Sequence, residues 1–346
     1  MIAAIYWVIK LSANEALRPT ALRQRCYILR LRSIVESMKT LSSISPIFII
    51  GAPRSGTSIM NWAIGQHPNI QVMPETAWLV DYITGAFAAY DRGSARGEFS
   101  HLSNVGYPLE SFLSTVAESI HSIVMEAYDR RCYFLYGDYE NLGIELDFSH
   151  PEAQFQVRRS PDDPKARWID STPLNTHYVW ALAQVFPQAK FIHNLRHPAD
   201  VALSLQHFDA AGATSAEVEE ACSIWIQHTQ NALLAERAFG SGRVFRVRYE
   251  RIAHEPEALM REVMAFLDEP YSDDCLLPLE TRVNSSRVDT ENTDAPSFIE
   301  ECAPLQQALD LYADTLVEAI PTVENSAARE RLKETFESHW RATFSR

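Results

Sequence analysis

The sequence lacks the excess of basic residues that marks most nucleic-acid-binding proteins. Over 346 residues it has 31 Lys and Arg against 45 Asp and Glu, a formal net charge of −14. This balance disfavours nucleic acid as a partner. An acidic protein can still bind an anionic ligand, but only through donors concentrated at one place, because its overall field repels the ligand.

The sequence also lacks paired cysteines and metal-ligand clusters. Its cysteines form no Cys-x-x-Cys pair and do not gather with histidines at zinc-site spacing; they are Cys26, Cys132, Cys222, Cys275 and Cys302. Scattered cysteines of odd number indicate reduced thiols, which are typical of a cytoplasmic protein. We therefore expect a cytoplasmic location and no bound metal.

No apolar run is long enough to cross a membrane. Met1 to Ile9 is apolar, but Lys10 interrupts it, and a spanning helix needs about 20 apolar residues. The run also lacks the basic flank and the cleavage site of a signal peptide. Arginines and apolar residues alternate after it, so we predict an N-terminal helical extension over residues 1–44. We favour packing of this helix on the rest of the chain; the alternative is a weak membrane contact through residues 1–35.

Short apolar strands alternate with helical patterns along the rest of the chain. This order predicts an α/β fold, with a central parallel sheet flanked by helices on both faces, in one domain over residues 45–346. Residues 129–165 are polar and rich in aspartate and proline, and we expect loops there. We predict strands at 46–50, 70–73, 167–169, 190–195 and 244–249, and helices from 59 and at 75–90, 109–128, 175–186, 198–208, 215–239, 256–267, 297–319 and 324–344.

The segment GAPRSGTS, residues 51–58, lies between a predicted strand and a predicted helix. It resembles the phosphate loop GxxxxGK[ST], with Thr57 in the place of the lysine and Arg54 as an earlier cation. The backbone N–H groups at a helix N-terminus can bind a phosphate there, together with the hydroxyls of Ser55, Thr57 and Ser58. The simpler alternative is a glycine turn with a surface arginine.

A second anion-binding pair is predicted in KFIHNLRHPADVALSLQHF, residues 190–208. Arg196 ends the strand, and Ser204 lies about two turns into the following helix. A strand-end arginine and a helix serine can converge on one anion. Taken alone, the spacing is equally compatible with a solvated arginine and an ordinary helix serine.

Together, PIFIIGAPRSGTS and RHPADVALS resemble the sulfotransferases that use 3′-phosphoadenosine 5′-phosphosulfate (PAPS), which share a P-loop NTPase-like architecture. The arginine form PRSGT is similar to the bacterial and the tyrosylprotein enzymes. The resemblance implies that Arg54 contacts the 5′-phosphosulfate and that the backbone of residues 55–58, which includes Gly56, wraps the phosphate. It also implies that Arg196 and Ser204 hold the 3′-phosphate. Phe208 stands where some relatives carry a further arginine.

Two further stretches extend the resemblance. VFRVRYERIAHEP, residues 244–256, implies that Tyr249 lies near the adenine, although a strand-end tyrosine with a solvated hydroxyl explains the same pattern. RVNSSRV, residues 282–288, lies where the family closes a loop over the nucleotide, which makes Ser285, Ser286 and Arg287 candidate contacts. Polar turn residues are the alternative there.

The resemblance also implies a general base. Glu75, in HPNIQVMPET, would take the acceptor proton, which requires a carboxylate close to the acceptor oxygen with a pKa raised by partial burial. The alternative is a helix N-terminal glutamate favoured by the helix dipole. Ser171 stands where many relatives have a lysine before the Thr-Pro of WIDSTP, so Asp170 and His177 are second candidates for acid–base work or acceptor binding.

These observations predict a sulfotransferase that moves the sulfuryl group of PAPS to a hydroxyl of a small-molecule or carbohydrate acceptor. One alternative is a kinase-like phosphoryl transferase, which would need the loop lysine and a strand-end aspartate for Mg²⁺. Thr57 argues against it. The other alternative is a non-catalytic nucleotide-binding homologue that has lost the chemistry.

Overall fold

The computed structural model describes residues 44–136, 165–206, 217–280 and 303–344. The chain divides into two units, residues 1–40 and 41–346, and every described residue belongs to the second. The predicted extension over residues 1–44, with its proposed membrane contact, therefore lies outside the described residues except for Ile44. Among the described helices, none is long and apolar enough to cross a membrane.

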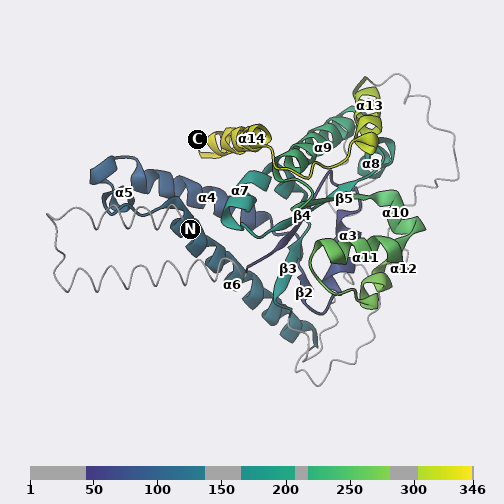
Figure 1. Ribbon diagram of the computed structural model, residues 1–346, viewed down its shortest axis with the longest axis horizontal. Coiled ribbons are helices and arrows are strands. Elements are labelled where there is room, and N and C mark those ends of the chain that lie inside the picture. Colours follow the sequence, from purple (N-terminus) through teal and green to yellow (C-terminus); the bar gives the residue numbers. More distant parts are fainter. Residues whose placement is uncertain (1–43, 137–164, 207–216, 281–302, 345–346) are drawn as a thin grey trace. The chain divides into compact units, whose positions relative to one another are not determined.

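A five-stranded sheet forms the centre of the fold (Figure 1). Its order is β2-β3-β1-β4-β5, and all four strand pairs are parallel. The strands are β1 (Ile47–Ile50), β2 (Ile70–Val72), β3 (Arg167–Asp170), β4 (Lys190–Leu195) and β5 (Val244–Arg248). The predicted parallel sheet is confirmed, and each strand ends within one residue of its predicted end.

The central strand β1 is buried on both faces, which explains its unbroken apolar run IFII. Because side chains alternate along a strand, Phe48 and Ile50 join one hydrophobic cluster, and Ile47 and Ile49 join another on the opposite face. Covering both faces requires helices on both sides of the sheet, as predicted.

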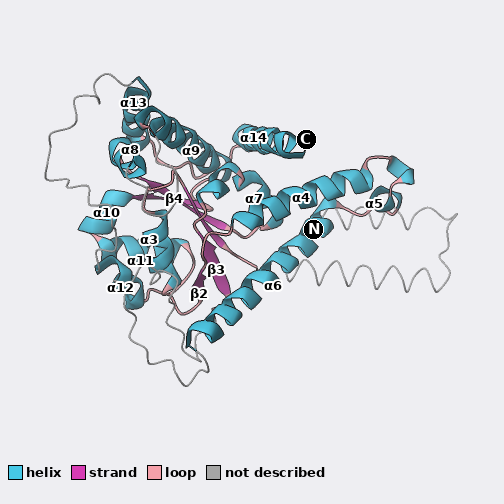
Figure 2. Cartoon of the chain, turned by 180° about the vertical axis from the view of Figure 1, so that it is seen from behind, coloured by secondary structure: helices cyan, strands magenta, loops and turns pink. Residues whose placement is uncertain are grey.

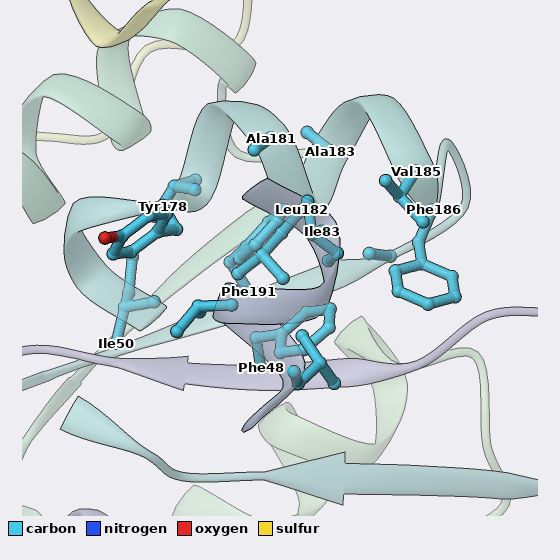
Figure 3. Close-up of a cluster of buried hydrophobic side chains, with 14 of the residues drawn as sticks. Phe48, Ile50, Ile83, Tyr178, Ala181, Leu182, Ala183, Val185, Phe186 and Phe191 are labelled. Atoms are coloured by element: carbon cyan, nitrogen blue, oxygen red, sulfur yellow. The ribbon is translucent and has the colours of Figure 1, made fainter. Parts of the chain in front are cut away.

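One face is covered by five helices. Phe48, Ile50 and Phe191 of the sheet pack against side chains such as Ile83 and Leu182 from these helices (Figure 3). Phe87 also belongs to this core and packs against Phe336. The helices are α4 (Ala77–Ser94), α6 (Leu109–Tyr136), α7 (Val179–Val185), α9 (Val218–Phe239) and α14 (Ser326–Phe344).

The opposite face is covered by α3 (Thr57–Gly65), α10 (Tyr249–His254), α11 (Pro256–Phe266), the 3-10 helix η6 (Asp273–Leu276) and the short helix α12 (Leu277–Glu280). Figure 2 shows α3, α10, α11 and α12 from behind. A third cluster joins α8 (Pro198–Gln206) and α13 (Ala303–Val317) to α9. The remaining described elements are η1 (Gly97–Phe99), α5 (His101–Asn104) and η4 (Pro173–His177).

The structure corrects several boundaries. The predicted loops at 129–165 are wrong for residues 129–136, because α6 continues to Tyr136; residues 137–164 lie outside the described part. Asp129 and Arg130 are exposed on this helix, and Arg130 forms an i,i+4 ion pair with Glu126 at 2.6 Å. Residues 175–177 form a 3-10 turn before α7, and Tyr249 begins α10 instead of ending the last strand.

Candidate functional site

The connection between β1 and α3 has the backbone of a phosphate loop. Gly51, Arg54 and Gly56 have φ angles of 134°, 67° and 86°, so the chain turns sharply before α3 begins at Thr57. Gly56 is the N-cap of α3, and the first N–H groups of a helix have no partners within the helix. These groups at the helix N-terminus favour an anion.

Close backbone approaches require glycine at both ends of this loop. A Cβ atom on Gly51 would lie 2.4 Å from the carbonyl oxygen of Asn194 in β4. A Cβ atom on Gly56 would lie 2.4 Å from Cδ2 of the Tyr249 ring. The loop is therefore fitted tightly against the ends of β4 and β5.

The sheet register brings Arg196 to the loop. Ile50 of β1 pairs with His193 of β4, so the residues that follow both strands emerge at the same edge. Arg196 donates from Nη1 to the carbonyl oxygen of Arg54 at 3.0 Å. Its guanidinium carbon lies 4.3 Å from the centre of the Tyr249 ring, within the range of a cation–π contact. Arg54, in turn, donates from Nε to Ser204 Oγ at 3.0 Å.

The electrostatics of this cluster favour an anion. Burial lowers the pKa of Arg54, and the positive charge of Arg196 lowers it further. The Arg196 side chain is only 12% exposed, and its Nε is buried without a hydrogen-bond partner; Asp200 Oδ2 lies 4.0 Å away. Ser55 Oγ is likewise buried without a partner. Two close cations and two unsatisfied polar atoms together form a site that an anionic ligand would complete.

Glu75 lies between β2 and α4 on a segment held by several hydrogen bonds, one of them from the N–H of Met73 to the Ile169 carbonyl at 3.2 Å. Asn61 Nδ2 donates to the Met73 carbonyl at 2.9 Å, and the N–H of Thr76 donates to Thr172 Oγ1 at 2.7 Å. Thr76 Oγ1 donates to Asp170 Oδ2 at 2.5 Å. Glu75 itself faces solvent. Partial burial still raises the pKa of its carboxyl, and the negative charge of Asp170 raises it further.

Asp170 and His177, the second candidates for acid–base work or acceptor binding, lie in different surroundings. Asp170 is fully buried and accepts hydrogen bonds from neighbouring donors. His177 lies against the ring of His228, with centroids 4.4 Å apart, and its Nδ1 is 2.7 Å from Nδ2 of Asn231. Burial lowers the pKa of His228.

Three residues of this region were missed by the sequence reasoning. Thr172 and Asn175 bind Asp170, and Thr176 Oγ1 accepts a hydrogen bond from the N–H of Gly51 at 2.9 Å. The available signal was the concentration of short hydroxyl and amide side chains in DSTPLNTH, directly after a buried strand.

The predicted site residues therefore fall into three groups. Arg54, Arg196, Ser204 and Tyr249 meet at the loop, which also holds the buried Ser55 and Thr57, while Ser58 is exposed. Glu75 is held separately through Thr76. The proposed contacts Ser285, Ser286 and Arg287 lie outside the described residues. Within the described part of the chain, no group of three or more His, Cys, Asp or Glu side chains is arranged to hold a metal ion.

The architecture defines an α/β protein of the parallel-sheet class with a phosphate-loop turn at the carboxyl end of its central strand. The profile of the Sulfotransferase family matches residues 46–273, and the chain belongs to that family.

Individual relatives are distant. An uncharacterized protein of Aquifex aeolicus is 26% identical over 260 residues, which are 72% of this chain and 29% of that protein. The protein-tyrosine sulfotransferase of Drosophila melanogaster is 23% identical over 236 residues, 66% of this chain and 38% of the relative. The matches thus span well under half the length of both relatives. The sulfotransferase domain from the Synechococcus PCC 7002 olefin synthase aligns with 85% of this chain and 96% of its own, at 21% identity and a TM-score of 0.40.

Proposed function

We propose that this protein transfers the sulfuryl group of PAPS to a hydroxyl-type acceptor. The observation that carries the proposal is the meeting of Arg54 and Arg196, which are 142 residues apart and are joined through the Arg196 Nη1 to Arg54 carbonyl bond. PAPS carries phosphate groups at the 3′ and 5′ positions of its ribose. Two adjacent cations match that distribution of charge.

The residues present fit such a donor. The loop amides before and within the first turn of α3, with Arg54, would hold the 5′-phosphosulfate. Arg196 and Ser204 would hold the 3′-phosphate, which would give the buried Arg196 Nε the partner that it lacks. Tyr249 stacks on Arg196 and would lie beside the adenosine. Ser286 and Arg287 remain proposed contacts of the same nucleotide.

The proposed chemistry needs positioning, charge neutralisation and one base. PAPS supplies the electrophilic sulfur and a phosphate leaving group. In the transfer, the acceptor oxygen forms a bond to sulfur as the bond from sulfur to the 5′-phosphate oxygen breaks. Arg54 would stabilise the negative charge that develops on the leaving phosphate. Glu75 would take the acceptor proton, and the raised pKa of its carboxyl makes it a stronger base. No step in this scheme requires a metal.

The acceptor is proposed as a hydroxyl on a small molecule or a carbohydrate. The Drosophila relative is named for protein tyrosine, whose phenol is also a hydroxyl acceptor. A tyrosine peptide therefore belongs in any acceptor panel beside sugars, alcohols and simple phenols.

We also propose residues 45–346 as the transferase domain and the cytoplasm as its location. The family match over residues 46–273 falls within that range. The cytoplasmic proposal rests on cysteine usage: Cys222 and Cys275 are buried free thiols.

The test combines transfer and binding assays. Labelled PAPS with the acceptor panel in EDTA should give labelled product, and ATP with Mg²⁺ should give none. In calorimetry with 3′,5′-diphosphoadenosine, Arg196→Ala should weaken binding by roughly 10- to 150-fold, the loss of a charge-assisted contact of about 1.5–3 kcal/mol. Arg331→Ala, at an exposed site on α14, is the matched control and should leave binding unchanged. Unchanged affinity in Arg196→Ala would remove the second anion site. Tight binding without transfer to any acceptor would favour a non-catalytic homologue.

A further inference from the structure

Asp170 is an unusual carboxylate. It is the last residue of β3 and is fully buried, and none of the described lysines or arginines forms an ion pair with it. Four neutral donors surround it instead. Thr76 Oγ1 and Asn175 Nδ2 donate to Oδ2 at 2.5 and 2.9 Å, and the N–H and Oγ1 of Thr172 donate to Oδ1 at 3.0 and 2.6 Å. Burying a carboxylate costs several kcal/mol unless hydrogen bonds compensate for the lost hydration. An apolar residue of similar size at this position would stabilise the fold at least as well, so stability alone does not explain an aspartate here.

The bond from Thr76 to Asp170 replaces an ordinary helix cap. Thr76 is the N-cap residue of α4, yet its hydroxyl makes no bond to the helix N–H groups. A threonine cap is typically worth about 1 kcal/mol, and here the hydroxyl is directed to Asp170 instead. The N–H of Thr76 is also held, by Thr172 Oγ1. The backbone that follows Glu75 is thus fixed at two points.

The same carboxylate is linked to the phosphate loop. Asn175 binds Asp170, and the next residue, Thr176, accepts the hydrogen bond from the N–H of Gly51. Gly51 is the first residue of the phosphate loop, so a short series of buried bonds runs from Thr76 through Asp170 to that loop.

We propose that Asp170 is a positioning residue that ties the Glu75–Thr76 segment to the Asn175–Thr176 turn and so sets the place of Glu75 relative to the phosphate loop. The proposal rests on the proposed function, in which Glu75 takes the acceptor proton. Asp170 does not itself carry that proton, because both of its oxygens are buried and already accept hydrogen bonds.

The charge of Asp170 has a second, measurable effect. Burial raises the pKa of Glu75, and the charge of Asp170 adds to the rise. The other side chains that hold this part of the site, Asn61, Thr172 and Asn175, are neutral. Since a base acts when deprotonated, a raised pKa places the acidic limb of the pH–rate profile at higher pH. Removing the charge of Asp170 should move that limb to lower pH.

Asp170→Asn and Thr76→Val separate the two effects. Both should lower kcat by about 10- to 100-fold, the usual consequence of a misplaced reacting group, while the KM for PAPS stays within about 2-fold of wild type. Only Asp170→Asn should shift the acidic limb to lower pH, because Thr76→Val keeps the charge. Thr115→Val, which removes an exposed hydroxyl bonded within α6, is the matched control and should behave as wild type.

A titration independent of turnover completes the test. Carbon-13 NMR of the glutamate carboxyls, with Glu75 assigned through Glu75→Gln, should show a lower Glu75 pKa in Asp170→Asn. An unmoved Glu75 pKa, wild-type kcat in both variants, or PAPS binding that falls in step with kcat would overturn the proposal. If the wild type transfers no sulfuryl group, the proposed function fails, and the titration still decides whether Asp170 acts on Glu75. If Asp170→Asn does not fold, Thr76→Val tests the proposal, because its kcat should fall while its KM for PAPS stays unchanged.

Discussion

Gly56→Ala should damage the phosphate loop for two separable reasons. Gly56 has φ 86° and ψ 18°, in the left-handed region, and the added Cβ would lie 2.4 and 2.6 Å from two atoms of the Tyr249 ring. The ring has little freedom to move away, because it stacks on Arg196, which is bonded to Arg54. Both the backbone and the side-chain contact therefore oppose the substitution.

The size of the effect follows from these contacts. A left-handed conformation costs an alanine about 1–2 kcal/mol, and an overpacked contact adds about 1–3 kcal/mol. The lower entropy of the unfolded alanine chain offsets about 0.4–1 kcal/mol. The net loss in the free energy of unfolding should be about 1–5 kcal/mol. Affinity for 3′,5′-diphosphoadenosine should fall as well, since relief of the contact must move the loop or the ring.

Gly85→Ala is the matched control. Gly85 lies inside α4, does not have a positive φ, and has open space where a Cβ would be placed. Alanine there should raise the free energy of unfolding by about 0.5–1 kcal/mol. Urea unfolding of both variants measures whether the free energy of unfolding falls in Gly56→Ala and rises in Gly85→Ala. Calorimetry measures their affinity for 3′,5′-diphosphoadenosine.

A double-mutant cycle with Tyr249→Ala isolates the contact. If the ring is the obstacle, the penalty of Gly56→Ala should shrink by at least about 1 kcal/mol when the ring is absent. An equal penalty with and without the ring would show that backbone strain alone matters. A wild-type stability and affinity in Gly56→Ala would refute the reasoning altogether.

Two buried charges give further predictions. Lys165 is 1% exposed and donates to three backbone carbonyls at and beyond the end of α3. Lys165→Met should therefore lower the free energy of unfolding, measured in urea, by about 2–3 kcal/mol. A loss under about 0.5 kcal/mol would contradict this prediction. Burial raises the pKa of Glu236, but its hydrogen bonds to His193 and Arg246 have the larger effect and leave that pKa lowered. Glu236→Gln should therefore lower the free energy of unfolding by about 3–5 kcal/mol at neutral pH. Because the folded pKa is lowered, this deficit should be complete above the ordinary glutamate pKa of 4.5 and shrink as the pH falls below it; a deficit independent of pH would contradict the assignment.

The sheet and the phosphate loop were predictable because their signals are local. The central strand is an unbroken apolar run, and its alternate side chains fill two different cores. The loop was predictable from the octapeptide GAPRSGTS directly after a buried strand, in which Gly51 and Gly56 both have positive φ. The adjacency of Arg196 followed from the family resemblance and from parallel strands that end at one edge.

Other features depend on contacts that no local pattern reveals. The bond between Thr76 and Asp170 joins residues 94 positions apart, and the bonds of Lys165 span about 100 positions. Lys165 fell within a segment that its polar composition marks as loop, yet it is almost completely buried. Composition predicts the exposure of charged residues on average. It fails where a specific set of hydrogen-bond partners offsets the cost of burying a charged group.

The central position of β1 divides the residues of the proposed chemistry into two groups, one on each side. From β1 the chain proceeds to β2 and β3 on one side, and later to β4 and β5 on the other. The strands on the second side deliver Arg196 and Tyr249, which we assign to the donor. The strands on the first side deliver Glu75, which we assign to the acceptor proton, and Asp170, which we assign to the positioning of Glu75.

Such a reversal of strand order is where open parallel sheets bind ligands, because the connecting segments diverge there and leave the end of the central strand accessible. The phosphate loop follows directly from β1, so it lies beside both groups. It bonds to Arg196 on one side and, through Thr176, to the Asp170 bonds on the other. A donor seated on this loop would therefore present its sulfur between residues that neither pair of strands alone brings together.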